Sequence, residues 1–596
     1  MKPTHLAFAA ALLLAFPLAG SAADPAIVTA EAAALSPEQQ VEALFAKWNK
    51  PDVPGAEVVV IRDGKVVLSK AYGMADLERA VPITTQTVFN IGSISKQFTA
   101  LAIQLLAADG KLALDDDMRK YFPEWPDLKH KITIRHLLHH TSGLRDSSNL
   151  LYLAGWRYDD VATSDDLLNM LKQQRTLNFA PGVEHLYNNT GYVVLAAIVE
   201  RVSGKPLGAF AKERIFDPLG MKHTRFLTSH TDLAPNRALS YQLAQDGAYR
   251  YSPVSKVAPG PSDVLTTAED LALWDGNFDD GRIGGKEVQA KMLEAGVLNS
   301  GAPVNYASGL YFDTYRGLKL VEHLGTVGGY ISLMSRFPSQ HFTVVVLANA
   351  RSVNPVKLSR QITDIYLDRE LAPKPVAAAP KQYPAEVKLD KSQLAAVAGF
   401  YALGPDFGCN FTSEDGGLMI QCTGQGKLPL YASAERAFFA KAVDARFSFD
   451  APGKNGLSPR FVLHQNGAAQ PALRGRKPAL SPKDMRAYEG QYYSDELRVL
   501  YTVARKEGKL VMTFPRGELS MDYAGGGKFF VAGPVGVATF DCAMPARCTG
   551  FKVHGERVRE LRFTKVTIVA SGATKPKDLP GKLGKPGVRA IQLRSN

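Results

Sequence analysis

The stretch that decides the fold is Ile91-Gly92-Ser93-Ile94-Ser95-Lys96-Gln97-Phe98-Thr99-Ala100, which continues into an apolar run over residues 101–106. The pattern predicts a helix, so that Ser93 and Lys96 are neighbours three residues apart in its first turn. A hydroxyl at a helix N-terminus gains the positive end of the dipole, and an adjacent amine can accept its proton. This spacing is common by chance, so its meaning depends on other motifs.

A second polar segment, Tyr187-Asn188-Asn189-Thr190-Gly191-Tyr192, precedes an apolar stretch that predicts a helix over residues 193–202. A tyrosine on a polar loop beside a lysine can act as a phenolate base or a proton relay. Asn189 can donate a hydrogen bond to an acyl amide oxygen and also orient Lys96. Taken alone, the segment also fits a turn with a packed tyrosine.

A third segment, His323-Leu324-Gly325-Thr326-Val327-Gly328-Gly329-Tyr330, directly precedes a predicted strand. Gly325 lacks a side chain, which would let a substrate backbone approach. The N–H of Thr326 would help to hold an oxyanion. The three segments together supply a nucleophile, proton carriers and an oxyanion donor.

The flanking sequence predicts an α+β domain. Residues 56–68 form two β-branched runs around an Asp63-Gly64 turn, which is a strong hairpin signal. Residues 331–347 predict a second hairpin around Pro338-Ser339, and residues 357–371 a closing helix. The patterns between the hairpins are mostly helical, so we expect an antiparallel sheet completed by both ends of the domain and flanked by helices, with a helical subdomain.

The C-terminal third contains a duplication. Leu389-DKSQLAAVA-Gly399-Phe-Tyr401 matches Leu480-SPKDMRAYE-Gly490-Gln-Tyr492, and three further matches follow in the same order at displacements of 90 to 92 residues. Short strands and glycine turns in each copy predict two small antiparallel β-barrels. We therefore expect a signal peptide at 1–23, a catalytic domain at 24–372, a Pro/Ala-rich linker at 373–388, barrels at 389–477 and 478–570, and a basic flexible tail at 571–596.

The three motifs, with Ser93, Tyr187 and His323 separated by 94 and 136 residues, resemble the penicillin-recognising serine hydrolases. The similarity covers about residues 40 to 370 and is greatest to the branch of class C β-lactamases, D-aminopeptidases and esterases. Two supporting segments, at residues 132–144 and 266–274, also resemble that family. D-aminopeptidase carries two β-barrels after its catalytic domain, and the duplication parallels them.

The resemblance implies a role for each site residue. Ser93 would be the acyl-forming nucleophile, Lys96 and Tyr187 would share the acid–base work, and Asn189 would position substrate. The N–H groups of Ser93 and Thr326 would form the oxyanion hole.

The third motif departs from the class C pattern, because His323-Leu324-Gly325 stands where those enzymes carry Lys-Thr-Gly. A neutral imidazole attracts a substrate carboxylate less than an ammonium does. We therefore expect a D-aminopeptidase- or esterase-like hydrolase of amides or esters of small D-amino-acid-type substrates, with no cofactor. The alternatives are a β-lactamase or DD-carboxypeptidase, and a penicillin-binding receptor or cell-wall scaffold with little turnover.

The N-terminus predicts export. Lys2 precedes an apolar run over residues 6–19 and then Gly20-Ser21-Ala22-Ala23, which is the pattern of a secretory signal. Ser21 stands where a lipoprotein would carry its lipidated cysteine, so we expect a periplasmic or secreted protein without a lipid anchor and without an integral membrane segment after signal removal.

The composition is that of an ordinary globular protein. The 596 residues are 45% hydrophobic and 21% charged, with a net charge of +12. Residues 566–596 carry five of these net positive charges. No basic patch with interspersed aromatic residues accompanies them, as nucleic-acid binding would favour. The charge therefore favours adsorption to anionic cell-wall polymer over nucleic-acid binding.

All four cysteines lie in the duplicated region. An even count in an exported chain favours disulfides, and the local pairs Cys409–Cys422 and Cys542–Cys548 are the simplest of the three connectivities. His136, His139 and His140 share a helical spacing, but no carboxylate accompanies them, so no metal site is expected.

Overall fold

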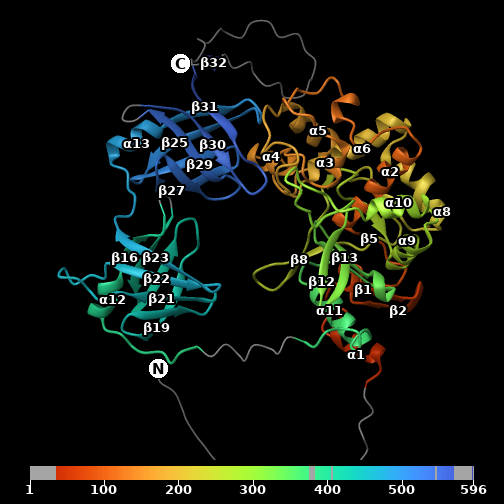
Figure 1. Cartoon of the computed structure of the whole chain (residues 1–596), viewed down its shortest axis with the longest axis horizontal. Coiled ribbons are helices and arrows are strands. Elements are labelled where there is room, and N and C mark those ends of the chain that lie inside the picture. Colours follow the sequence, from red (N-terminus) through yellow and green to blue (C-terminus); the bar gives the residue numbers. More distant parts are fainter. Residues whose placement is uncertain (1–34, 375–382, 405–406, 544–546, 569–592, 595–596) are drawn as a thin grey trace, which may run out of the picture.

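A computed structural model describes residues 35–374, 383–404, 407–543, 547–568 and 593–594 (Figure 1). The predicted signal peptide, half of the predicted linker and most of the predicted tail lie outside the described residues. What is described comprises an α+β domain followed by two antiparallel β-barrels, as the sequence predicts.

The α+β domain is built on a six-stranded antiparallel sheet in the order β12-β13-β14-β15-β1-β2. Both predicted hairpins are part of it, and β1 from the start of the domain pairs with β15 from its end. The two ends of the domain therefore complete one sheet. Its strands are β1 (Ala56–Arg62), β2 (Lys65–Tyr72), β12 (Tyr311–Tyr315), β13 (Leu318–Val327), β14 (Tyr330–Phe337) and β15 (Phe342–Ala348).

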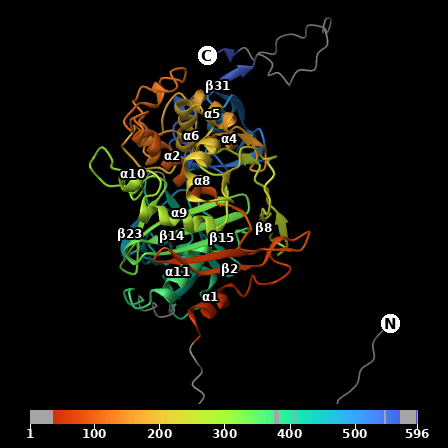
Figure 2. The same cartoon turned by 90° about the vertical axis from the view of Figure 1, so that its right-hand side faces the viewer.

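Helices cover both faces of this sheet, as Figure 2 shows. One face packs against α1 (Pro37–Phe45) and α11 (Pro355–Tyr366), which starts two residues before and ends five residues before the predicted closing helix. The other face packs against α9 (Ala268–Asp280) and α2 (Lys96–Ala108). Helix α2 is buried from Lys96 to Leu106, so its first turn is held rigidly inside the domain.

The helical subdomain packs around α2 and α6. Among the described residues, no helix has the length and apolar character needed to cross a membrane. The helices of the helical subdomain are α3 (Ile134–Leu138), α4 (Ser147–Leu153), α5 (Ser164–Gln173), α6 (Asn189–Ser203), α7 (Leu207–Ala211), α8 (Asp217–Leu219) and α10 (Gly285–Met292). The domain also contains short strands before and between these helices: β3 (Met74–Asp76), β4 (Val81–Pro82), β5 (Phe89–Asn90), β6 (Ala162–Thr163), β7 (Arg225–Phe226), β8 (Tyr241–Leu243), β9 (Tyr249–Tyr251), β10 (Lys256–Val257) and β11 (Val264–Thr266).

Each barrel has eight strands and is preceded by a short helix that the sequence reading did not predict. The first consists of α12 (Lys391–Val397), β16 (Gly399–Ala402), β17 (Gly408–Glu414), β18 (Gly417–Cys422), β19 (Leu428–Ala434), β20 (Ala437–Ala440), β21 (Ala445–Phe449), β22 (Arg460–Gln465) and β23 (Ala468–Gly475). The second consists of α13 (Pro482–Tyr488), β24 (Gly490–Ser494), β25 (Val499–Lys506), β26 (Lys509–Phe514), β27 (Gly517–Gly525), β28 (Lys528–Val531), β29 (Gly536–Ala543), β30 (Arg547–His554) and β31 (Leu561–Ile568), with β32 (Leu593–Arg594) added at β31.

Equivalent residues of the two barrels make equivalent contacts, which explains the sequence repeat. Tyr401 is buried and donates to the carbonyl of Val397, and Tyr492 is buried and donates to that of Tyr488. Each tyrosine therefore ties the preceding helix to the first strand. Cys409–Cys422 joins β17 to β18 and Cys542–Cys548 joins β29 to β30, in the pairing that the sequence favoured.

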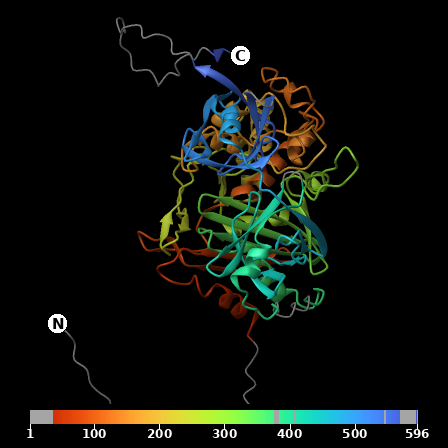
Figure 3. The same cartoon turned by 90° about the vertical axis from the view of Figure 1, so that its left-hand side faces the viewer.

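The second barrel packs directly on the α+β domain near α4 (Figure 1) and lies in front of part of that domain in the view of Figure 3. Arg145 is fully buried and pairs with Glu496, with 2.8 Å between Nη1 and Oε2. Tyr501 donates to the carbonyl of Leu153 at 2.6 Å. This contact brings the loop between β30 and β31 to the site described next.

Candidate active site

Ser93 and Lys96 face each other at the centre of the catalytic domain. Ser93 lies on a 3₁₀ turn, η1 (Gly92–Ser95), directly before α2 rather than within the α-helix as expected. The Nζ of Lys96 is 3.0 Å from Ser93 Oγ, 3.0 Å from Asn189 Oδ1 and 2.8 Å from the carbonyl oxygen of Pro261. The structure thus brings three of the predicted site residues into one hydrogen-bonded group.

Glycines allow strand β13 to lie against this turn. A Cβ on Gly325 would be 1.8 Å from the carbonyl oxygen of Ile91, and a Cβ on Gly92 would be 2.5 Å from the nitrogen of Thr326. The backbone that approaches Gly325 in the structure is that of Ile91, which is a reason for glycine separate from the predicted approach of substrate. The close packing places Thr326 N–H beside the nucleophile turn, as an oxyanion donor requires.

Burial controls the charge of Lys96. The side chain is fully buried, and this desolvation lowers the pKa of Lys96 well below its usual value. The carboxylate of Asp146 opposes the shift, whereas Arg557 and Lys256 reinforce it. A neutral amine has two N–H donors, which the oxygens of Asn189 and Pro261 can accept, so its lone pair is left for the proton of Ser93.

Tyr187 lies on the loop before α6, where its phenol is close enough to Ser93 for the Ser93 hydroxyl to affect its pKa. Burial raises the pKa of Tyr187 strongly, so the phenol is protonated at neutral pH. Lys96 Nζ is 4.8 Å from the centre of its ring, and the guanidinium carbon of Arg557 is 5.2 Å from it. Tyr187 is therefore placed as a proton donor next to the nucleophile, and the phenolate-base alternative is disfavoured.

Asn189 is fixed by the start of α6. Its backbone N–H donates to Asp146 Oδ2 at 2.9 Å, while its neighbour Asn188 caps the helix by accepting from Gly191 N–H. Asp146 in turn caps α4 through Ser148 and Asn149. One carboxylate thus positions both the amide that holds Lys96 and the start of α4.

The histidines at 136, 139 and 140 have structural contacts. His136 closes a capping box with Thr133, and His140 Nδ1 accepts from Asn188 N–H at 3.2 Å. His139 is buried, which lowers its pKa to about 4. Among the described residues, no group of three or more histidine, cysteine or acidic side chains is arranged to hold a metal ion.

His323 is buried, with 2% of its surface exposed, close to Lys96 and the ring of Tyr187. Its Nδ1 is 2.7 Å from the carbonyl oxygen of Leu324, so Nδ1 carries the proton, and Nε2 accepts from Tyr306 Oη at 3.1 Å. Burial lowers the pKa of His323 to about 3. The imidazole is therefore neutral and has no charge to offer a substrate carboxylate.

A pocket of about 100 Å³ opens at Ser93, Asn189 and Thr326. Its far end is formed by residues that no motif predicted, namely Lys256, Ser148, Tyr152 and Tyr158. Arg557 is another functional residue that the motifs missed, because it belongs to the second barrel. Lys256 and Arg557 have no fixed spacing from the three motifs, so the sequence held no signal for either.

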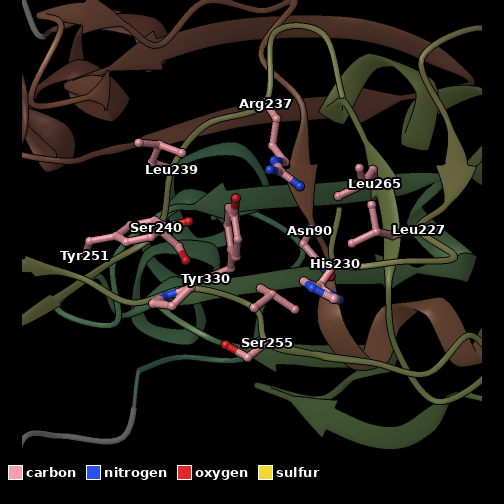
Figure 4. A pocket seen from close by; sticks show the side chains of 12 residues that line it. Asn90, Leu227, His230, Arg237, Leu239, Ser240, Tyr251, Ser255, Leu265 and Tyr330 are labelled. Atoms are coloured by element: carbon pink, nitrogen blue, oxygen red, sulfur yellow. The ribbon is translucent and has the colours of Figure 1, made fainter. Parts of the chain in front are cut away.

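A second pocket, of about 140 Å³, is next to the first, and Pro253, Val254 and Ser255 line both pockets (Figure 4). Figure 4 shows Arg237 directed toward Tyr330, whose hydroxyl donates to the carbonyl of Ala238. Ser93 does not line this pocket. The chemistry is therefore assigned to the first pocket.

A half-buried serine beside a buried lysine, a protonated tyrosine next to them and two N–H groups at the serine are the features of a serine hydrolase on an α+β scaffold. Residues 39–366 match the sequence model of the family described as Beta-lactamase. This chain belongs to the β-lactamase family.

Individual relatives were also found. Penicillin-binding protein 4* of Bacillus subtilis (strain 168) is 27% identical over 456 residues, which are 73% of this chain and 98% of that protein. D-aminopeptidase of Brucella anthropi is 30% identical over 285 residues, which are 46% of this chain and 52% of that enzyme. The octameric penicillin-binding protein homologue from Pyrococcus abyssi, at 23% identity, has a TM-score of 0.51 over 80% of this chain and 98% of its own, which shows a shared fold.

Proposed function

We propose that the chain is an exported hydrolase that cleaves amide or ester bonds of small D-amino-acid-type substrates through an acyl-enzyme on Ser93. Neutral Lys96 accepts the Ser93 proton as Oγ attacks the substrate carbonyl. The developing oxyanion lies between the N–H groups of Ser93 and Thr326. Tyr187 donates a proton to the leaving nitrogen or oxygen and is reprotonated by the Lys96 ammonium. Water then attacks the acyl carbonyl, Lys96 takes the proton of the water, and that proton passes to Ser93 Oγ as the ester bond breaks.

One observation carries this mechanism: Lys96 Nζ lies 3.0 Å from Ser93 Oγ, fully buried and held by two other oxygens. Burial lowers the pKa of the amine and so favours its neutral, basic form, and its contacts with Asn189 and Pro261 aim its lone pair at the hydroxyl. The residues named carry every proton that moves, so the reaction as written uses no cofactor.

Two observations support the substrate class. The similarity to D-aminopeptidase and a neutral His323 in place of a lysine favour D-amino-acid amides or esters over lactams. A β-lactamase or DD-carboxypeptidase is the second candidate, because the similarity to penicillin-binding protein 4* covers nearly all of that protein. A penicillin-binding receptor or cell-wall scaffold with little turnover is the third.

The proposed location is the periplasm or the medium, on the strength of the signal sequence. In that setting the barrels and the basic tail would contact cell-wall polymer. The acid–base site remains the same whichever substrate reaches it.

The test is covalent labelling of the full-length protein. Intact mass after incubation with a fluorophosphonate, and separately with a penicillin, should show one adduct on the wild type and none on Ser93→Ala. Labelling that persists on Ser93→Ala rejects the mechanism. Turnover of D- and L-aminoacyl amides, esters and dipeptides then separates the candidates: release of product from D-amides supports the first, and stable penicillin adducts without turnover support the third.

A further inference from the structure

Lys256, on β10, is the second lysine at the nucleophile's pocket, which it lines together with Ser93. Its Nζ donates to Ser148 Oγ at 2.8 Å. Among the described residues no carboxylate lies within ion-pair distance of it. An ammonium has three donors, so the others are left for a pocket occupant.

The nearest acidic side chains are already committed to other donors. Asp146 accepts from the backbone of Ser148 and of Asn189. Asp263 accepts from the backbone of Ala258 and from two side chains. Burial lowers the pKa of Lys256, and these two carboxylates oppose the shift only from a distance. A bound anion would therefore meet an ammonium that lacks a direct counter-ion.

The position of Tyr187 shows which half of a substrate reaches Lys256. The leaving group must lie beside the proton donor, and Tyr187 is absent from the residues that line the Lys256 pocket. The same pocket includes Asn189 and Thr326, beside which the substrate carbonyl is held. The half of the substrate that stays on Ser93, the acyl group, therefore extends toward Lys256.

The walls of this pocket suit a short chain with a polar end. Tyr152 and Tyr158 stack with their ring centres 6.3 Å apart and line the pocket together with Lys256. Arg351 donates to Tyr158 Oη at 2.9 Å and to the carbonyl of Gly328 at 2.8 Å, which adds a second positive charge near the rim. A pocket lined by aromatic rings, with an ammonium at one end, disfavours a positive charge at the far end of the acyl group and favours a carboxylate there.

We propose that Lys256 is a specificity-determining residue that binds a carboxylate at the far end of the acyl group. The preferred substrates are then amides or esters of dicarboxylic acids or of acidic amino acids. Ser148 positions the ammonium by accepting a hydrogen bond from it. This inference rests on the proposed function, because it assumes an acyl-enzyme on Ser93.

The test compares two esters that differ by one charge: the mono-4-nitrophenyl ester of glutaric acid, and the same compound with its free carboxylate methylated. Nitrophenolate release should show a wild-type preference for the acid of at least about tenfold in kcat/KM, as expected for a hydrogen bond to a charged group. Because Lys256 also lowers the pKa of Lys96, both esters are compared at a pH above the acid limb of each protein. There Lys256→Met should remove the preference, lowering kcat/KM for the acid about 10- to 100-fold, mainly through KM, and changing that for the methylated ester less than about twofold. Lys256→Arg should retain most of the preference.

Lys286→Met is the matched control, because Lys286 is an exposed lysine on α10 outside the pocket. Fluorophosphonate labelling of Ser93 in every variant reports whether the catalytic group is intact. Three results would overturn the role of Lys256 and leave the proposed function standing, provided that Ser93 is labelled normally. They are an unchanged preference in Lys256→Met, equal losses on both esters in that variant, and release of no nitrophenolate from either ester. Absence of labelling in the wild type would overturn both.

Discussion

Arg557, from the second barrel, lies over the ring of Tyr187, the proposed proton donor, with 5.2 Å between guanidinium carbon and ring centre. The backbone around it is anchored on the catalytic side: Asn178 donates to the carbonyl of Arg557 at 3.1 Å and accepts from Arg559 N–H at 2.7 Å. The site is therefore made by two domains, and a charge from the barrel acts on the groups that move protons.

Removing this charge should move the pH dependence of the enzyme. Arg557 lowers the pKa of Lys96, and activity requires neutral Lys96, so activity rises as pH rises through that pKa. In Arg557→Met the pKa of Lys96 rises, and the acid limb of kcat/KM should move to higher pH by about one pH unit, the effect of a charge roughly 10 Å away at an effective dielectric constant of about 20.

The measurement is kcat/KM against pH on one ester for wild type and variant. Arg486→Met, an exposed arginine on α13 of the same barrel, is the control and should leave the profile unchanged. An acid limb that stays in place or moves to lower pH in Arg557→Met contradicts the assignment.

The separate roles of Lys96 and Tyr187 predict different substrate dependence. Lys96→Ala should lower acylation at least about 100-fold for every substrate, because it removes the base for Ser93. Tyr187→Phe should lower amide hydrolysis by a similar factor but 4-nitrophenyl ester hydrolysis much less, because nitrophenolate departs without a proton. Stopped-flow acylation on an anilide and an ester of the same acid measures both. Equal losses on the two substrates in Tyr187→Phe would reject the proton-donor role.

Local sequence signals predicted the elements that carry the chemistry. The Asp63-Gly64 turn defined the first hairpin, and the spacing of Ser93 and Lys96 placed both side chains at one point of the chain. The repeat also had a local cause, since Tyr401 and Tyr492 each tie a helix to a strand within four residues. These features depend on neighbouring residues, which is why one sequence was enough to find them.

The contacts that only the folded chain makes were not predictable in this way. Lys256 reaches the site because β10 pairs with β6, and Arg557 because a barrel docks about 370 residues further along the chain than Tyr187. Glycine at 325 also has a separate reason that the sequence did not reveal, since the group that approaches it in the structure is the carbonyl of Ile91. Long-range packing leaves no spacing pattern in a single sequence.

The docking of the second barrel should depend on the ion pair between Arg145 and Glu496. Arg145 is fully buried, so Glu496→Ala leaves an uncompensated charge in the interior and should lower the free energy of unfolding by about 3 kcal/mol. Glu518→Ala, which breaks the exposed pair with Lys506 in the same barrel, should cost less than about 1 kcal/mol. Urea unfolding of both variants gives the two values, and similar costs would show that the buried pair does not hold the barrel in place.

His323 gives the last prediction, and the structure changes the expected result. With lysine absent from the third motif, the sequence suggested that His323→Lys would supply an ammonium for a lactam carboxylate and raise lactam acylation roughly tenfold. The side chain is instead buried beside Lys96 and engaged by Leu324 and Tyr306. A lysine there would bury a second cation next to Lys96.

His323→Lys should therefore lose penicillin acylation and D-aminoacyl ester hydrolysis in parallel, at least about tenfold each, with a stability cost of about 3 kcal/mol for an unpaired buried charge. His323→Gln should retain most activity, because an amide can accept from Tyr306 and donate to the carbonyl of Leu324 as the neutral imidazole does. Acylation rates on both substrates, measured with melting temperatures for the three proteins, decide the matter. A selective gain in penicillin acylation by His323→Lys at an unchanged melting temperature would restore His323 as the residue that separates lactams from uncharged esters, and would make a β-lactamase an equal candidate.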